Sequence, residues 1–157
     1  KLIPIELPAI SNYDISFILT AEAGAAFDQL TRSNEDDQLV RQIKNAWPNV
    51  FRSSRFIPAV EYINANRIRF LLIQQMNEMI KELDFYIAPS WVGNNLLVTN
   101  LTGHPSVVIP TGFSEAGTPT SITFIGKLFE EGTIIAAAKK YQDQTAYHKK
   151  HPPLFRK

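Results

Sequence analysis

Three β-rich runs follow one another between residues 84 and 126: Asp84-Phe85-Tyr86-Ile87-Ala88-Pro89, Ser106-Val107-Val108-Ile109-Pro110 and Thr120-Ser121-Ile122-Thr123-Phe124-Ile125-Gly126. Each run is rich in β-branched or aromatic residues and ends near proline, glycine or asparagine, which is typical of short strands. Alternation in the third run places Ile122 and Phe124 on one face. We therefore expect three strands, separated by a loop with a helical turn at 90–100 and by a turn at 111–119.

Helices are expected on both sides of these strands. The longest apolar pattern at helical spacing runs from residue 58 to residue 83, and a second runs from 130 to 148. Nearer the start, residues 14–34 and 35–46 predict two shorter helices, the second opened by Glu35-Asp36-Asp37 and stopped by Pro48. The three acids are interpreted as favourable charges in a first helical turn rather than as metal ligands. This order predicts an α/β or α+β fold.

Composition limits the classes of protein to be considered. The chain has 157 residues, of which 45% are hydrophobic and 20% charged, with a net charge of +1 and no cysteine. This length predicts that residues 1–157 form a single domain or a partial domain. The balanced charge gives no indication of a nucleic-acid partner, and no apolar run approaches the roughly 18 residues that span a membrane. We expect a soluble chain, and the sequence does not distinguish the cytoplasm from the periplasm.

The histidines and glycines of the sequence, taken one by one, do not define an active site. His104 stands next to a glycine and a proline and is interpreted as a turn residue. His148 and His151 lack a nearby carboxylate, which makes them a poor zinc site. The seven glycines show no spacing typical of a phosphate-binding loop. Residue chemistry alone therefore assigns no catalytic residue, no metal ligand and no cofactor.

The order of motifs in the second half resembles a known family. The run Asn100-Leu101-Thr102-Gly103-His104-Pro105-Ser106-Val107-Val108-Ile109-Pro110 follows the strand at 84–89, and Gly117-Thr118-Pro119 opens the strand that ends at Gly126. A helix beginning at Ile57-Pro58 precedes them, and Phe129-Glu130-Glu131-Gly132-Thr133 follows. Together they resemble the C-terminal part of amidase-signature hydrolases, closely from 57 to 153 and more loosely before. The resemblance implies the C-terminal portion of the amidase-signature fold, an α/β fold with helices packed on strands of a mixed sheet.

The resemblance also implies an activity, although this chain lacks the catalytic residues for it. Family members hydrolyse carboxamides through a serine acyl-enzyme, with a second serine in a cis peptide and a lysine base, and without a metal or cofactor. The chain has no Gly-Gly-Ser-Ser run and no lysine that matches the family base, so no catalytic residue carries over. We therefore expect the C-terminal segment of an amidase, inactive by itself, that supplies packing and part of the substrate pocket. The alternative is a free-standing, catalytically inactive binding or scaffold domain derived from the same fold.

The resemblance places candidate pocket residues in one loop. In relatives the loop before the Asn-Leu-x-Gly turn reaches toward the substrate, and here it contains Trp91, Gly93, Asn94 and Asn95. Trp91 would flank an apolar group and Asn95 would hydrogen-bond an amide, whereas the competing interpretation is a buried tryptophan with turn-forming asparagines. The expected partner is a small-molecule amide, with neither nucleic acid nor membrane. We expect the isolated chain to self-associate, because it exposes strand edges and an apolar face that a larger fold would cover.

Overall fold

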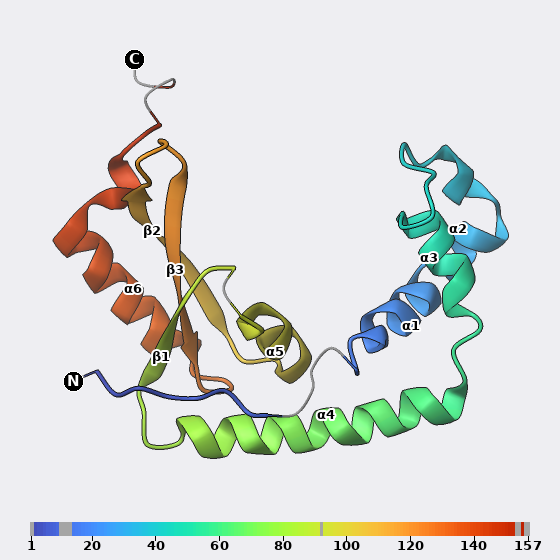
Figure 1. Ribbon diagram of the computed structural model, residues 1–157, viewed down its shortest axis with the longest axis horizontal. Helices are drawn as coiled ribbons and strands as arrows, with labels where there is room; N and C mark the ends of the chain where they lie inside the picture. The colour runs from blue at the N-terminus through green and yellow to red at the C-terminus, as the bar shows by residue number, and fades with distance from the viewer. Residues whose placement is uncertain (1, 10–13, 92, 153–154, 156–157) are drawn as a thin grey trace. The chain divides into compact units, whose positions relative to one another are not determined.

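The chain divides into two compact units. The computed structural model describes residues 2–9, 14–91, 93–152 and 155. One unit comprises Lys1–Ala9 and Leu72–Lys157, and the other comprises Ile10–Leu71. Helix α4 (Ala59–Ile80) supplies residues to both (Figure 1). The prediction of a single or partial domain stays a prediction.

A three-stranded sheet forms the centre of the first unit. Strands β1 (Phe85–Pro89), β2 (Ser106–Phe113) and β3 (Pro119–Gly126) lie in the order β1-β3-β2. These strands correspond to the three β-rich runs, and the α/β class is confirmed. Both pairings between the described strands are antiparallel, so the mixed sheet is supported only in part.

Helices lie against the two faces of this sheet (Figure 1). Helix α6 (Glu131–Thr145) packs Ile134 and Ala138 against Ile109 and Phe124, with Ile122 partly buried beside them. The predicted common face of Ile122 and Phe124 is therefore confirmed. Helix α5 (Asn95–Thr102) contacts the strands from the opposite face, where the Tyr86 hydroxyl donates to Asn95 Oδ1 at 2.7 Å. Strand alternation thus separates an apolar core under α6 from a more polar face under α5.

Helix α5 occupies the segment for which the sequence predicted only a loop with a helical turn. It has eight residues and ends at Gly103, whose φ of 77° is the left-handed conformation common after a helix. The Gly103 N–H donates to the Thr99 carbonyl at 2.8 Å. A side chain at position 103 would strain this turn, so glycine fixes the point at which the chain leaves α5 for β2.

The second unit is helical. It contains α1 (Phe17–Ala26), α2 (Asp28–Arg32), the 3-10 turn η1 (Glu35–Gln38), α3 (Trp47–Ser54) and the first half of α4. The single helix predicted at 14–34 is interrupted at Phe27. The predicted helix at 35–46 is wrong beyond η1, and Pro48 lies in the first turn of α3 instead of ending a helix. Proline is tolerated there because the first turn has no helical acceptor for its missing N–H.

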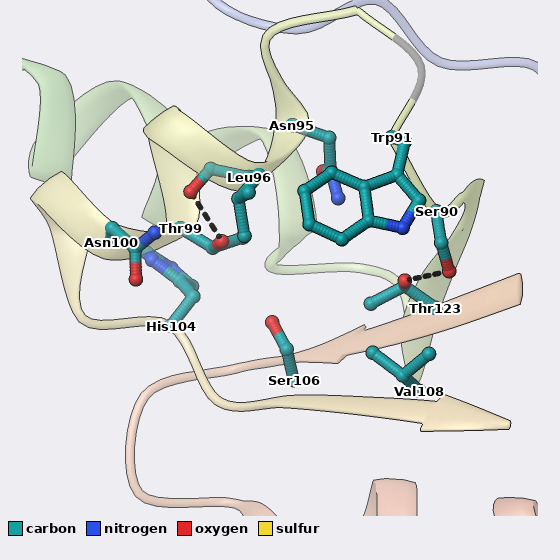
Figure 2. Close-up of a pocket in the computed structure, with 10 residues that line it drawn as sticks. All are labelled: Ser90, Trp91, Asn95, Leu96, Thr99, Asn100, His104, Ser106, Val108 and Thr123. Atoms are coloured by element: carbon teal, nitrogen blue, oxygen red, sulfur yellow. Dashed lines mark hydrogen bonds between the residues drawn. The ribbon is translucent and has the colours of Figure 1, made fainter.

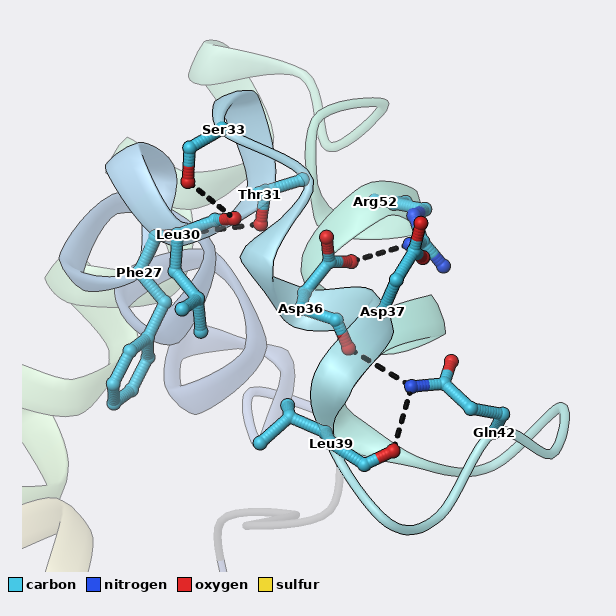
Figure 3. Close-up of polar contacts among 9 residues, drawn as sticks. All are labelled: Phe27, Leu30, Thr31, Ser33, Asp36, Asp37, Leu39, Gln42 and Arg52. Atoms are coloured by element: carbon cyan, nitrogen blue, oxygen red, sulfur yellow. Dashed lines mark hydrogen bonds and ion pairs between the residues drawn. The ribbon is translucent and has the colours of Figure 1, made fainter.

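The three acids at 35–37 lie in the first turn of η1, and two of them also form ion pairs with an arginine (Figure 3). Asp36 is fully buried, and Arg52 Nη2 lies 2.5 Å from its Oδ2. The same nitrogen lies 2.7 Å from the exposed carboxylate of Asp37. Gln42 Nε2 donates to the Asp36 and Leu39 carbonyls at 2.8 Å each, which closes the loop after η1. Within the described ranges no three His, Cys, Asp or Glu side chains gather as metal ligands.

Gly24 marks a close approach of α1 to α3. A Cβ built on Gly24 would lie 1.8 Å from Ser54 Oγ and 2.8 Å from Ser54 Cβ. Rotation of the serine can move the oxygen but not its Cβ, so the two helices must separate. Gly24→Ala is therefore expected to lower the free energy of unfolding by about 1–3 kcal/mol, as overpacked cores do.

Gly132 provides the matched control, because it lies in α6 and a Cβ there would meet nothing within 4 Å. Gly132→Ala is expected to stabilise the chain by up to about 1 kcal/mol through helix propensity. Urea unfolding followed by circular dichroism measures both variants. Equal effects of the two substitutions would contradict the close approach at Gly24.

No helix in the described part of the chain is long and apolar enough to cross a membrane.

Candidate functional site

A cavity of about 340 Å³ lies between α5 and the adjacent face of the sheet (Figure 2). Its walls come from the end of β1, from α5, from the loop after α5 and from β2 and β3. The lining residues are Ser90, Trp91, Asn95, Leu96, Thr99, Asn100, His104, Ser106, Val108 and Thr123. All of them belong to the first unit.

Strand alternation explains which residues reach the cavity from the sheet. Val108 pairs with Thr123 across β2 and β3, and both side chains lie on the face opposite Phe124. Ser106 is two residues before Val108 and shares its face. The hydroxyls of Ser90 and Thr123 are 2.9 Å apart and form a hydrogen bond, which ties the end of β1 to β3 at the cavity wall.

The cavity brings together two of the four predicted pocket residues. Trp91 and Asn95 line it, whereas Gly93 and Asn94 do not. Gly93 has a φ of 62° and makes the turn into α5, and Asn94 is the residue preceding that helix. Both therefore shape the approach to the cavity rather than its wall.

Trp91 stands at the mouth of the cavity. Its side chain is 86% exposed, so the competing interpretation of a buried tryptophan is wrong. Its φ of 72° is unusual for a bulky residue, and such a conformation costs about 1–3 kcal/mol that the rest of the structure has to offset. The indole ring lines the opening, where it offers a flat apolar surface to a ligand.

Asn95 is buried and held in place by Tyr86. The Tyr86 hydroxyl donates to Asn95 Oδ1 at 2.7 Å. Burial raises the pKa of Tyr86, so the phenol keeps its proton and stays a donor at neutral pH. With Oδ1 engaged, the Nδ2 amino group is the part of Asn95 that can donate to a carbonyl in the cavity.

His104 is a cavity residue that the sequence did not predict as one. It was interpreted as a turn residue, but only 4% of its surface is exposed, and its ring lines the cavity. Nδ1 lies 2.8 Å from Thr102 Oγ1, while Nε2 is buried without a hydrogen-bond partner. Burial lowers the pKa of His104, which keeps the ring neutral at pH 7. The sequence carried no signal of this burial, because a histidine beside glycine and proline is equally compatible with an exposed turn.

The cavity wall is polar but uncharged. None of its ten lining residues is Asp, Glu, Lys or Arg, and the one titratable group among them is the neutral His104. Such a wall favours a small neutral ligand with hydrogen-bonding groups and an apolar part. No catalytic residue is assigned in it.

Acid is expected to destabilise the chain through His104. Because its folded pKa is lowered, the unfolded state binds a proton more readily than the folded state does. The stabilising contribution is complete above the ordinary histidine pKa of about 6.5 and is lost as pH falls through the lower folded pKa. Urea unfolding between about pH 7 and pH 5 should show this loss in the wild type and less of it in His104→Gln.

The exposed His148 is the matched position for this measurement. His148→Gln removes a histidine outside the cavity and is measured as the control. An identical pH dependence in His104→Gln and the wild type would contradict the burial of a neutral ring at 104.

The fold places the chain among amidase structures. A bacterial aryl acylamidase of the amidase signature enzymes family matches it with a TM-score of 0.72 and 16% identity, over 95% of this chain and 37% of the other. The peptide amidase from Stenotrophomonas maltophilia matches with a TM-score of 0.71 and 18% identity, over 96% and 37%. The expected amidase-signature fold is thereby confirmed.

A sequence relative supports the same assignment. The chain is 30% identical over 112 residues to a glutamyl-tRNA(Gln) amidotransferase subunit from Oceanobacillus iheyensis, a match that covers 59% of this chain and 23% of that protein. The chain thus spans about a quarter of the length of this curated relative. No model of a protein family matches the chain. In sequence and in fold, this chain resembles amidase-signature proteins.

Proposed function

We propose that this chain is the C-terminal segment of an amidase-type hydrolase and that its cavity under α5 forms one wall of the substrate pocket. One observation carries the proposal: an uncharged, hydrogen-bonding cavity with an indole ring at its mouth occurs in a chain that resembles amidase-signature proteins. A carboxamide is itself neutral and polar. It therefore enters such a cavity without the desolvation cost of a charged ligand.

The proposed role of these residues is binding and orientation. The Asn95 amino group would donate to the substrate carbonyl, and the Trp91 ring would pack against the apolar group attached to it. The acyl-enzyme step needs an activated serine and donors for the oxyanion, which we assign to residues outside this chain. Positioning of a bound amide by such walls is itself a large part of catalysis.

The test compares this chain with the product of the complete reading frame that contains it. Ammonia release from benzamide, propionamide and other primary amides is measured for both proteins. We expect the product of the complete frame to release ammonia and the 157-residue chain to release none. Release by the 157-residue chain, or by neither protein, would contradict the proposal. The second outcome would favour a binding or scaffold domain.

Self-association of the isolated chain is also expected. Val60, Ile63, Phe70 and Leu71 are large apolar residues in the part of α4 that belongs to the second unit, and their side chains are exposed. Light scattering at micromolar concentrations should show a mass above that of the monomer, and Ile63→Lys combined with Phe70→Lys should lower it. A monomer at all of these concentrations would contradict the expectation.

A further inference from the structure

Three large apolar side chains of the cavity under α5 are open to a ligand. The exposed fractions are 86% for Trp91, 60% for Val108 and 52% for Leu96, and all three residues line the same cavity. They come from three different elements, namely the loop after β1, strand β2 and helix α5. Exposed apolar surface is stabilised when an apolar group of a ligand covers it. The cavity therefore has an apolar part that a ligand can reach.

Ser106 supplies a polar group beside this apolar part. It precedes Val108 by two residues on β2, so the two side chains share a face of the sheet, with their Cα atoms about 6.8 Å apart. The Ser106 side chain is exposed, and Figure 2 shows its hydroxyl directed into the cavity. In the part of the chain that the structure describes, no hydrogen bond engages this hydroxyl. It can therefore donate a hydrogen bond to a ligand or accept one.

The volume and the charge of the cavity limit the kind of ligand. An apolar cavity of about 150 Å³ is large enough for one benzene molecule. The cavity under α5 has about 340 Å³, which is room for one ring together with a small polar group. Because no charged side chain lines it, a charged group would lose its hydration there without finding a counter-charge. The polar group of the ligand is therefore neutral, as a carboxamide is.

The indole ring of Trp91 distinguishes a flat ring from other apolar groups of similar size. Aromatic rings attract each other beyond the effect of the area that they bury, because the negative face of one ring meets the positive edge of another. A saturated ring covers a similar apolar area but lacks this attraction. The exposed indole at the mouth of the cavity thus favours an aromatic ligand.

We propose that this cavity selects primary amides of aromatic acids, whose ring contacts Trp91 and Val108 and whose amide group binds the Ser106 hydroxyl. The inference rests on the proposed function, since it names the substrate class of the same cavity. An amide attached directly to a ring lies beside that ring, as Ser106 lies beside Val108 on β2. Small aliphatic amides leave the indole and Leu96 uncovered and therefore bind more weakly.

Benzamide and cyclohexanecarboxamide provide the test, because they share the amide group and the number of carbon atoms and differ in the flatness of the ring. Both are titrated into this 157-residue chain and followed by NMR chemical shifts, including that of the Trp91 indole N–H. We expect benzamide to bind about 3- to 10-fold more tightly, the range for one aromatic pair. Equal affinities, a preference for cyclohexanecarboxamide, or no binding of benzamide would overturn the inference.

Two variants assign the preference for a flat ring to Trp91. Trp91→Leu keeps an apolar side chain but removes the aromatic face, so benzamide and cyclohexanecarboxamide should bind to it equally well. Trp47→Leu changes a tryptophan of the second unit and should keep the preference of the wild type. A preference for benzamide that survives in Trp91→Leu would overturn the inference.

The role of Ser106 is measured with the same two ligands. Ser106→Ala removes the hydroxyl and should weaken the binding of both amides by about 2- to 10-fold, the range for one hydrogen bond. Ser53→Ala, at an exposed serine of the second unit, should leave both affinities unchanged. An unchanged affinity in Ser106→Ala would overturn the inference. Ammonia release by the complete protein is a separate measurement, so failure of this selectivity and failure of the amidase function are distinguishable.

Discussion

Arg52→Met is expected to lower the free energy of unfolding by about 3–5 kcal/mol, because it leaves the buried carboxylate of Asp36 without its counter-charge. Asp36 is 0% exposed, and Arg52 is its ion-pair partner at 2.5 Å. Methionine replaces much of the volume of arginine and none of its charge. Urea unfolding followed by circular dichroism measures the change.

Asp37 offers a matched control at the same guanidinium. Its carboxylate also lies near Arg52 but stands in solvent, where an ion pair contributes at most about 1 kcal/mol. Asp37→Ala should therefore cost far less than Arg52→Met. Asp36→Asn should also cost less than Arg52→Met, because it removes the buried charge and leaves Arg52 paired with Asp37. A similar cost for Arg52→Met and Asp37→Ala would contradict a buried charge at 36.

Phe124→Ala is expected to destabilise the first unit by about 3–5 kcal/mol. Phe124 is buried under α6, and its ring stacks on Phe85 with centroids 5.1 Å apart and meets the edge of Tyr141 at 6.2 Å. Alanine would leave a cavity between the sheet and α6 that these rings cannot fill. The neighbouring Thr123 lines the candidate site from the other face of β3, so the site should loosen too.

The exposed Phe56 is the control for this substitution. Phe56→Ala should change the free energy of unfolding by no more than about 0.5 kcal/mol, as surface substitutions usually do. Thermal unfolding of both variants gives the comparison. A small effect of Phe124→Ala would contradict the core under α6.

The sheet could be predicted from the sequence because its strands are locally encoded. β-Branched runs ending at proline or glycine indicated all three strands, and the position of Phe124 followed from alternation. Helix α4 was predicted from its length and apolar period. Its first half, however, leaves Val60 and Ile63 exposed, so periodicity identified the helix without showing which face is covered.

The loop after η1 was mispredicted because a tertiary contact overrides local preference there. Glu35-Asp36-Asp37 favours a helix start, yet the burial of Asp36 against Arg52 ends the helical turn at Gln38. The two partners lie far apart in the sequence, and spacing along the chain does not reveal such a pair. Propensity is a weak guide when a buried charge must find its counter-charge.

The candidate site was predicted only where it lies in one loop. Trp91 and Asn95 were named from the resemblance, and both line the cavity. His104 was not, because a histidine beside glycine and proline is compatible with an exposed turn, and only the packing of α5 against the sheet buries it. The hydroxyls of Ser90 and Thr123 meet through strand pairing, which the sequence does not specify.

The central claim is that the cavity beside Trp91 belongs to the substrate pocket of an amidase. Its most direct test is the KM for benzamide of the protein translated from the complete reading frame, measured for the wild type, for Trp91→Ala and for the control Trp47→Ala. Loss of an aromatic contact predicts a KM raised about 5- to 10-fold in Trp91→Ala and unchanged in Trp47→Ala, whose side chain lies in the second unit. An unchanged KM in Trp91→Ala would contradict the claim.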